Sequence, residues 1–281
     1  MSDSFALAAD QLRELDRDRY TASLVIPSDH RAAVQSIFAF SAEIAAVRER
    51  VSEPGPGEIR LQWWVDAIEG EGHGAIASNP IADALFRTLG THALPSGPLL
   101  RLLAARRFDF YHDAMPDVGQ FEGYAGETVS VLYQYAAMIL GGGAVDAAAD
   151  AAGHLGVAQA LAGHIRAFGY NASRGQLFLP LAIFTANGVR EADIYAGKDS
   201  DAVRAALTQI GELAQTHADK AAVAISQLDA SIKPAFASLA LVRSDISALD
   251  RQIAQPFTAL SSSSAFSRLW SVIWWTLRNV R

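Results

Sequence analysis

Residues 155–180 read LGVAQALAGHIRAFGYNASRGQLFLP, and this stretch decides how the rest of the chain is interpreted. Its first part continues a helix-forming segment that starts near Asp146, just after the glycine run 141–143. Alanine, leucine and glutamine favour helices, whereas Leu179-Pro180 cannot continue one. We therefore predict a helix from Asp146 to about Asn171.

Proline and glycine divide the rest of the chain into further helices. The predicted helices cover residues 5–19, 28–51, 58–69, 99–112, 118–140, 199–228 and 234–260, and another starts at Pro80. The segment Pro54-Gly55-Pro56-Gly57 is predicted to be a loop. Short connectors between about ten helices favour an all-α fold in one domain, residues 1–281.

The composition excludes several classes of protein. The 281 residues are 51% hydrophobic, which suffices for one large core. There is no cysteine, so disulfides and zinc-cysteine sites are excluded. A net charge of −7 without any basic tract argues against a nucleic-acid partner. No signal-peptide pattern occurs, and we expect a cytoplasmic location.

Residues 155–180 resemble the second signature of squalene and phytoene synthases. That signature has a Leu-Gly helix, then Arg-Asp-x-x-x-Asp, then Arg-Gly-Arg-x-Tyr-Leu-Pro. The residues that agree are Leu155, Gly156, Arg166, Arg174, Gly175, Leu179 and Pro180. Phe178 stands in for the tyrosine and Gln176 for the last arginine.

Residues 38–49, FAFSAEIAAVRE, resemble the first signature, Tyr-Ala-Phe-Cys-Arg-x-x-Asp-x-x-x-Asp. Residues 107–110 and 124–141 resemble two further helices of the family. The resemblance implies an isoprenoid synthase-like helical bundle around a deep, apolar central cavity. The cavity candidates that it implies are Phe40, Tyr124, Glu127, Gly163 and Tyr170.

The chain departs from the family at its metal-binding aspartates. In the family, two Asp-x-x-x-Asp pairs hold Mg²⁺ on the substrate diphosphate. Here the first pair has become Ala45 and Glu49, and the second has become Ala167 and Asn171. Glu49 is the one remaining carboxylate, and Mg²⁺ is expected as a cofactor only if the chain is an active enzyme.

Four cations near these motifs are candidates for binding an anion directly, since guanidinium groups pair bidentately with phosphate. They are Arg48, His164, Arg166 and Arg174. Our leading hypothesis is therefore a protein that binds an isoprenoid or lipid without condensing it. The alternative is an active head-to-head prenyltransferase, and a third hypothesis is an interaction scaffold with a filled cavity.

The block Glu58-Ile59-Arg60-Leu61-Gln62-Trp63-Trp64, together with the degenerate motifs, resembles a divergent branch of the family. That branch includes the mitochondrial respiratory complex I assembly factors. The resemblance implies that the chain assists the assembly of a respiratory membrane complex.

Residues 265–281 predict a C-terminal amphipathic helix. Its apolar face comprises Phe266, Leu269, Trp270, Ile273, Trp274 and Leu277. We expect this face to dock on the protein's own core. The alternative is a contact with a membrane complex or with the surface of the inner membrane, since Trp and Arg suit the headgroup region.

Two charged segments have a simpler interpretation. Asp109, near His112, is expected on a solvated surface, with acid–base catalysis as the less favoured alternative. Arg19 is expected at an exposed helix end, with a local structural lock as the alternative.

Overall fold

The computed structural model describes residues 4–72, 76–258 and 264–280, and within them it contains helices and no strand. The helices are α1 (Ser4–Leu15), α2 (Arg17–Ser23), α3 (Ser28–Arg50), α4 (Pro54–Glu69), α5 (Pro80–Thr91), α6 (Gly97–Arg106), α7 (Val118–Ala125), α8 (Val131–Gly141), α9 (Ala149–Arg166), α10 (Phe168–Ser173), α11 (Leu181–Ala186), α12 (Glu191–Tyr195), α13 (Asp201–Ser226), α14 (Ser238–Ser247), α15 (Leu249–Ala254) and α16 (Ala265–Asn279). The predicted all-α class is confirmed.

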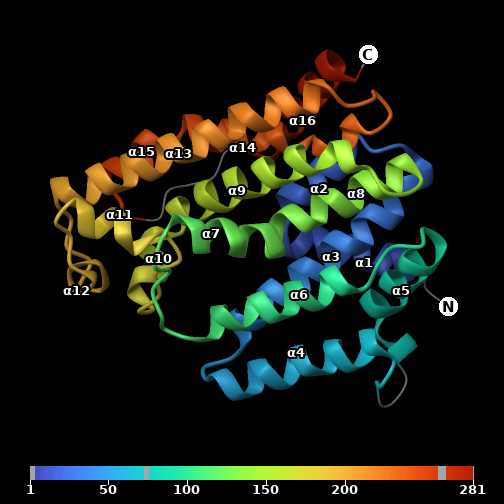
Figure 1. The fold of residues 1–281 in the computed structure, drawn as a ribbon, viewed down its shortest axis with the longest axis horizontal. Coiled ribbons are helices and arrows are strands. Elements are labelled where there is room, and N and C mark those ends of the chain that lie inside the picture. The colour runs from blue at the N-terminus through green and yellow to red at the C-terminus, as the bar shows by residue number, and fades with distance from the viewer. Residues whose placement is uncertain (1–3, 73–75, 259–263, 281) are drawn as a thin grey trace.

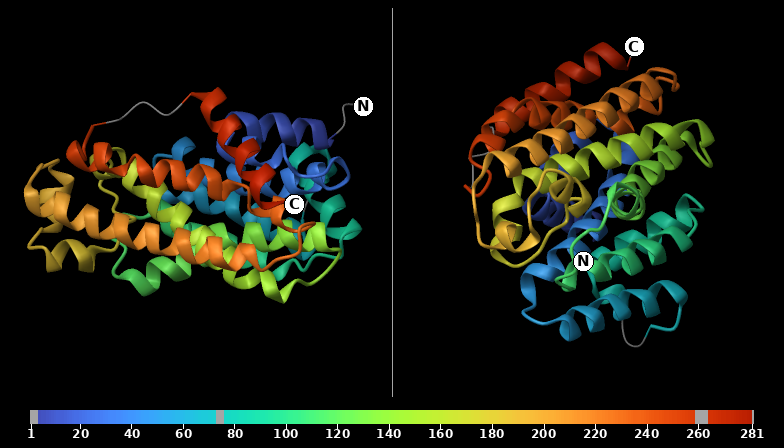
Figure 2. Two further views of the ribbon diagram at one scale, coloured as in Figure 1. Left: turned by 90° about the horizontal axis from the view of Figure 1, so that it is seen from above. Right: turned by 60° about the vertical axis from the view of Figure 1, so that its left-hand side comes forward.

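The helices stack from α4 at one edge of the molecule to α13 and α16 at the other (Figure 1). Helix α9 lies in the middle and packs along α13, while α3 packs against α1, α5 and α8 (Figure 2). The interior between these helices is filled mostly by alanine, leucine, isoleucine and valine side chains, with aromatic side chains among them. Those that are fully buried include Phe38, Phe40, Phe121, Tyr133, Tyr135, Phe184 and Phe236.

Several predicted helices are broken where a side chain caps the backbone or where packing bends it. The first is divided at Asp16, whose carboxylate accepts a hydrogen bond from the Arg19 amide at 2.9 Å. The predicted helix to Asn171 is divided at Ala167. The segment 118–140 contains a π-helical turn at Gly126–Ser130. Of the predicted helix 234–260, the described residues to 258 hold a 3₁₀ turn followed by two helices, and 259–260 lie outside the described residues.

The predicted loop at Pro54-Gly55-Pro56-Gly57 is wrong, because these residues form the first turn of α4. Proline is tolerated there, since the first amides of a helix have no intrahelical acceptor. Gly57 is required by packing: a Cβ at this position would lie 2.8 Å from the Phe110 ring.

Gly156 in α9 has a similar role. A Cβ at this glycine would lie 2.6 Å from the backbone of Ser130, so α9 can approach the π-helical turn only without a side chain there. The Leu-Gly pair of the second signature is thus a packing contact between α9 and its neighbour.

Helix α16 packs on α2 and α14, but with the face opposite to the predicted one. Its buried residues are Arg268 and Val272. Of the predicted face, Phe266, Trp270, Trp274 and Leu277 are exposed, and Leu269 and Ile273 are half-buried. The expectation that this apolar face docks on the core is therefore wrong. In the described part of the chain, no helix is long and apolar enough to cross a membrane.

Candidate functional site

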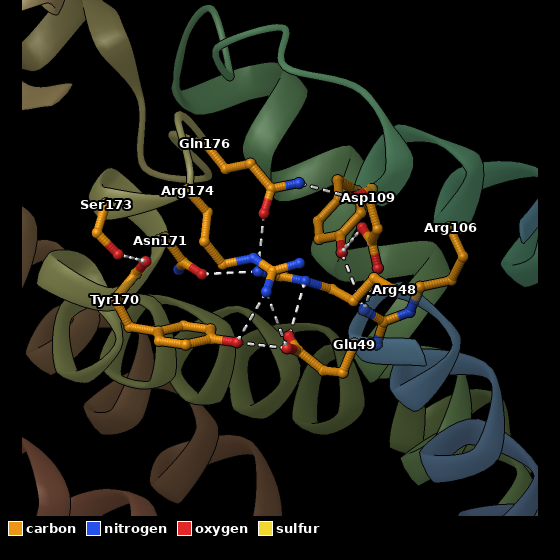
Figure 3. Close-up of polar contacts among 10 residues, drawn as sticks. Arg48, Glu49, Arg106, Asp109, Tyr170, Asn171, Ser173, Arg174 and Gln176 are labelled. Carbon is orange, nitrogen blue, oxygen red and sulfur yellow. Dashed lines mark hydrogen bonds and ion pairs between the residues drawn. The ribbon is translucent and has the colours of Figure 1, made fainter. Parts of the chain in front are cut away.

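The two signature segments meet through Arg48 of α3. Its guanidinium donates to Asn171 Oδ1 at 2.8 Å and to Gln176 Oε1 at 2.9 Å. It lies over the Phe178 ring, 4.7 Å from the ring centroid. Through these two hydrogen bonds, one cation joins α3 to α10 and to the segment that follows α10 (Figure 3). Both acceptor residues are buried.

The amide of Gln176 is held in turn by the backbone. Its Nε2 donates to the Asp109 carbonyl at 2.9 Å, which leaves Oε1 facing Arg48. The chain reaches this position through Gly175, whose φ of 67° lies in the left-handed region that favours glycine. Gly175 of the second signature thus turns the backbone so that Gln176 can act as a side-chain bridge.

The carboxylate of Glu49 is surrounded by donors from both segments. It lies 3.2 Å from Arg48 Nε and 3.6 Å from Arg174 Nη1, and it accepts a hydrogen bond from the Tyr170 hydroxyl. Tyr170 and Glu49 are at the surface, at the mouth of the site.

Asp109 is buried rather than solvated, and the expectation of a surface position is wrong. Its carboxylate accepts from Arg106 at 3.0 Å and from the Tyr124 hydroxyl at 2.6 Å. Arg106 also donates to the Tyr124 oxygen at 3.0 Å. Burial raises the pKa of Tyr124, so the phenol keeps its proton and remains a donor.

His164 of α9 stacks on Phe178, the aromatic ring that Arg48 also covers. Its ring is parallel to the Phe178 ring, with the centroids 4.8 Å apart. Burial, together with the charges of Arg48 and Arg106, lowers the pKa of His164 to about 3. The imidazole is therefore neutral at physiological pH, and it is not one of the cations of the site.

A pocket of about 330 Å³ opens between α3, α9 and the π-helical turn. It is lined by Arg19, Arg48, Glu49, Arg106, Tyr124, Thr128, Val129, Gln159, Ala160, Gly163, His164, Ala167, Tyr170 and Asn171. Three guanidinium groups, Arg19, Arg48 and Arg106, belong to this lining together with the Glu49 carboxylate, and Arg19 and Arg106 are also paired with Asp16 and Asp109. The lining is more polar than the deep apolar cavity that the resemblance implied.

The structure brings most of the predicted site residues to this pocket, but not all. Arg166 points into a second pocket, where it pairs with Asp245 at 2.6 Å. Glu127 turns toward Arg101, 3.1 Å away, and Phe40 is buried against Trp64. Each of these three side chains is turned toward its own partner, and none of the three lines the pocket of Arg48 and His164. Arg174 pairs with Glu49 at the mouth.

The sequence did not indicate Arg106, Gln159 or the buried position of Arg19. Arg19 pairs with Asp16 at 2.8 Å and lines the pocket, so the structural lock is the correct alternative. Gln159 accepts from the Tyr133 hydroxyl at 2.6 Å. The only sequence signal for Arg106 is its place in residues 106–110, RRFDF, where an arginine adjoins two phenylalanines and an aspartate.

The four motif positions do not fit a Mg²⁺ ion. Ala45 and Ala167 supply no ligand, and the Asn171 oxygen accepts from Arg48. The Glu49 carboxylate is engaged by two arginines and a tyrosine. Among residues 4–72, 76–258 and 264–280, no three His, Asp or Glu side chains form a group that could hold a metal.

The fold and these signatures define the class of protein. The sequence pattern of the squalene/phytoene synthase family matches residues 12–271, and the chain belongs to this family. Among solved structures, squalene synthase HpnC from Alicyclobacillus acidocaldarius superposes with a TM-score of 0.75 at 22% identity, over 90% of this chain and 95% of that one. A dehydrosqualene synthase in complex with ligand gives a TM-score of 0.77 at 16% identity, over 98% and 97%. At these identities the likeness shows the fold.

The curated relatives are proteins of the divergent branch. The "NADH dehydrogenase (ubiquinone) complex I, assembly factor 6" of Rattus norvegicus is 31% identical over 235 residues, or 83% of this chain and 70% of the relative. The Homo sapiens protein of the same name is 31% identical over 207 residues, or 73% of this chain and 62% of the relative. The resemblance to that branch is confirmed.

Proposed function

We propose that this protein binds the phosphate group of an isoprenoid or lipid without ionising it, and that it assists the assembly of respiratory complex I. The observation that carries the first part is the position of Arg48. Its guanidinium joins the two motif segments where the family's carboxylates would hold metal. A fixed guanidinium binds a phosphate but is a poor substitute for metal ions on a leaving diphosphate.

The pocket provides complementary chemistry for such a ligand. Arg48 offers its guanidinium beside Arg19 and Arg106, which Asp16 and Asp109 hold in place, and Val129 and Ala160 supply an apolar wall. The volume of about 330 Å³ suits a headgroup with the first part of an apolar chain. His164 is neutral and adds no charge, so the arginines are the anion-binding groups of this proposal.

Ligand binding is tested by thermal unfolding with farnesyl monophosphate and farnesyl diphosphate, each with and without Mg²⁺. We expect both phosphates to raise the melting temperature to the same extent with and without the metal, and farnesol to have little effect. Release of diphosphate that needs Mg²⁺ and disappears in Glu49→Ala would instead establish the active prenyltransferase, the alternative that rests on the retained Arg166, Arg174, Gly175 and Pro180.

A matched pair of glycine variants locates the ligand. A Cβ at Gly163 meets no atom within 4 Å, and Gly163 lines the pocket. Gly163→Leu should therefore fold, because it also raises helix propensity, but it should block the pocket. Gly153 lies in the same helix with the same free space and does not line the pocket, so Gly153→Leu should keep ligand binding. Equal binding by both variants would show that the ligand does not bind in this pocket.

The assembly role is supported by the names of the relatives with 31% identity. It is tested in human cells that lack complex I assembly factor 6, by expressing this chain with a mitochondrial targeting segment. We expect assembled complex I to return on native gels, and Gly163→Leu to reduce this rescue if the pocket is needed. No rescue by a chain that is expressed and folded would count against the assembly role. A peripheral contact of the chain with the membrane surface itself is proposed to involve α16.

A further inference from the structure

The C-terminal helix α16 is fixed to the body of the protein by a charged face. Arg268 is 6% exposed, pairs with Asp245 at 2.8 Å and also contacts Asp18 of α2. Val272, one turn further on, is completely buried against Ala22 and Leu241. The orientation of α16 is therefore set by a buried ion-pair group, which holds the opposite face toward solvent.

That opposite face is apolar and exposed. Phe266 is 77% exposed, Trp270 58%, Trp274 48% and Leu277 53%. Their spacing of three or four residues places them along one side of the helix. Of the ten large hydrophobic side chains that are exposed in the described part of the chain, these four lie on one helix of 15 residues. A contiguous apolar patch of this kind marks an interaction surface.

The charges around the face indicate which partner it fits. No acidic residue follows Asp250 in the sequence, although the whole chain carries a net charge of −7. The Arg278 guanidinium lies over the Trp274 ring, 4.4 Å from its centroid, at the end of the apolar face. Two copies of this face would bring cations together without an acidic partner, whereas an anionic lipid surface supplies the missing charge.

A groove beside the face has matching chemistry. Its volume is about 310 Å³, and it runs between α16, α13 and α14. The buried Ile225 and Leu239 line it together with Trp274, and the exposed Arg243 and Arg278 lie among its lining residues, with Arg243 paired to Asp219 at 2.9 Å. This combination suits one acyl chain with its phosphate at Arg278.

We propose that α16 is an interfacial membrane-binding helix, which inserts Phe266, Trp270, Trp274 and Leu277 into the headgroup region of a bilayer that contains anionic lipid. A helix of this length lies in the interface and does not span the bilayer. The docked face, held by Arg268, would then orient the whole bundle on the membrane. This surface is separate from the Arg48 pocket, so the proposal does not depend on the ligand proposed there.

The test is co-sedimentation of the full chain with vesicles of phosphatidylcholine, with or without phosphatidylglycerol. The native protein should bind the mixed vesicles, and the double variant Trp270→Ser, Trp274→Ser should bind at least about tenfold more weakly. Both side chains are exposed, so this variant should unfold like the native protein. The matched control is Ile59→Ser with Leu7→Ser, which removes exposed apolar side chains from α4 and α1 and should bind normally.

A charge variant separates lipid from protein as the partner. Arg278→Glu should weaken binding to the anionic vesicles by about tenfold and leave the weaker binding to neutral vesicles unchanged. The proposal is overturned if the native protein binds neither vesicle, or if the tryptophan variant binds like the control. It is also overturned if light scattering shows a native dimer that the tryptophan variant converts to a monomer, because the face would then be a protein interface.

Discussion

Replacing Arg48 with methionine tests whether one guanidinium joins the two signature segments. Methionine keeps an unbranched apolar stem against Phe178 but removes the donors to Asn171 and Gln176. A hydrogen bond from a charged donor contributes about 1.5 to 3 kcal/mol, and each buried acceptor left unpaired costs about 1 to 3 kcal/mol. Water in the adjacent pocket can reach part of this group, and the removed cation no longer needs desolvation. We therefore expect the free energy of unfolding to fall by about 3 kcal/mol.

The measurement is urea unfolding followed by circular dichroism, compared with Arg60→Met. The Arg60 side chain is 54% exposed and lies 3.8 Å from Glu43, so its replacement should change the free energy of unfolding by less than about 0.5 kcal/mol. Arg48→Lys keeps the charge without the planar fork, and its stability should fall between the native and methionine proteins. A loss below about 1 kcal/mol in Arg48→Met would refute the reasoning, because the bridge would then contribute little to joining α3 and α10.

Three further substitutions test other parts of the structure. The lowered pKa of His164, about 3, means that the unfolded chain takes up a proton below about pH 6.5 while the folded chain does not. The free energy of unfolding therefore decreases as the pH falls, by about 1.4 kcal/mol at pH 5.5. His164→Phe should remove this part of the pH dependence of urea unfolding. An unchanged dependence would contradict the lowered pKa of His164. Gly156→Ala places a methyl group 2.6 Å from the Ser130 backbone and should cost about 3 kcal/mol of stability, and a melting temperature equal to that of the native protein would show that α9 can shift. Arg268→Ala removes one of the two arginine partners of Asp245 and the contact with Asp18, so amide exchange should quicken in residues 265–279 but not in α9. Unchanged exchange would mean that Val272 alone fixes α16.

The local features of the fold could be predicted from the sequence. Helix formers between proline and glycine residues predicted an all-α chain, and α13 and α3 lie close to their predicted ranges. The breaks at Asp16 and Ala167 were missed, because a capping side chain or a bend is decided by the packing of a few residues. The loss of the motif carboxylates could also be inferred from residue identity alone, since the alanine side chain has no atom that can ligate a metal.

The partners of the site residues could not be inferred in this way. Arg48 and Gln176 are separated by 128 positions, and no local pattern pairs them. Glu127 and Arg166 occupy sequence positions that the family resemblance assigns to the site. Their side chains instead form ion pairs with Arg101 and Asp245, away from the pocket of Arg48. An ion pair forms where the fold places two charges together, and that placement depends on the whole chain.

Helix α16 shows most clearly what the sequence determines and what the tertiary structure decides. The sequence determined that residues 265–279 form a helix with an apolar side, because periodicity shows which residues share a face. Only the tertiary structure decided which face is buried, through the ion pair between Arg268 and Asp18, 250 positions apart. In the same way, the sequence determined that the metal motifs are degenerate, and the tertiary structure decided that a guanidinium joins them. The physical reason is the same in both cases: side-chain identity fixes which interactions are possible, and packing between distant segments fixes which of them form.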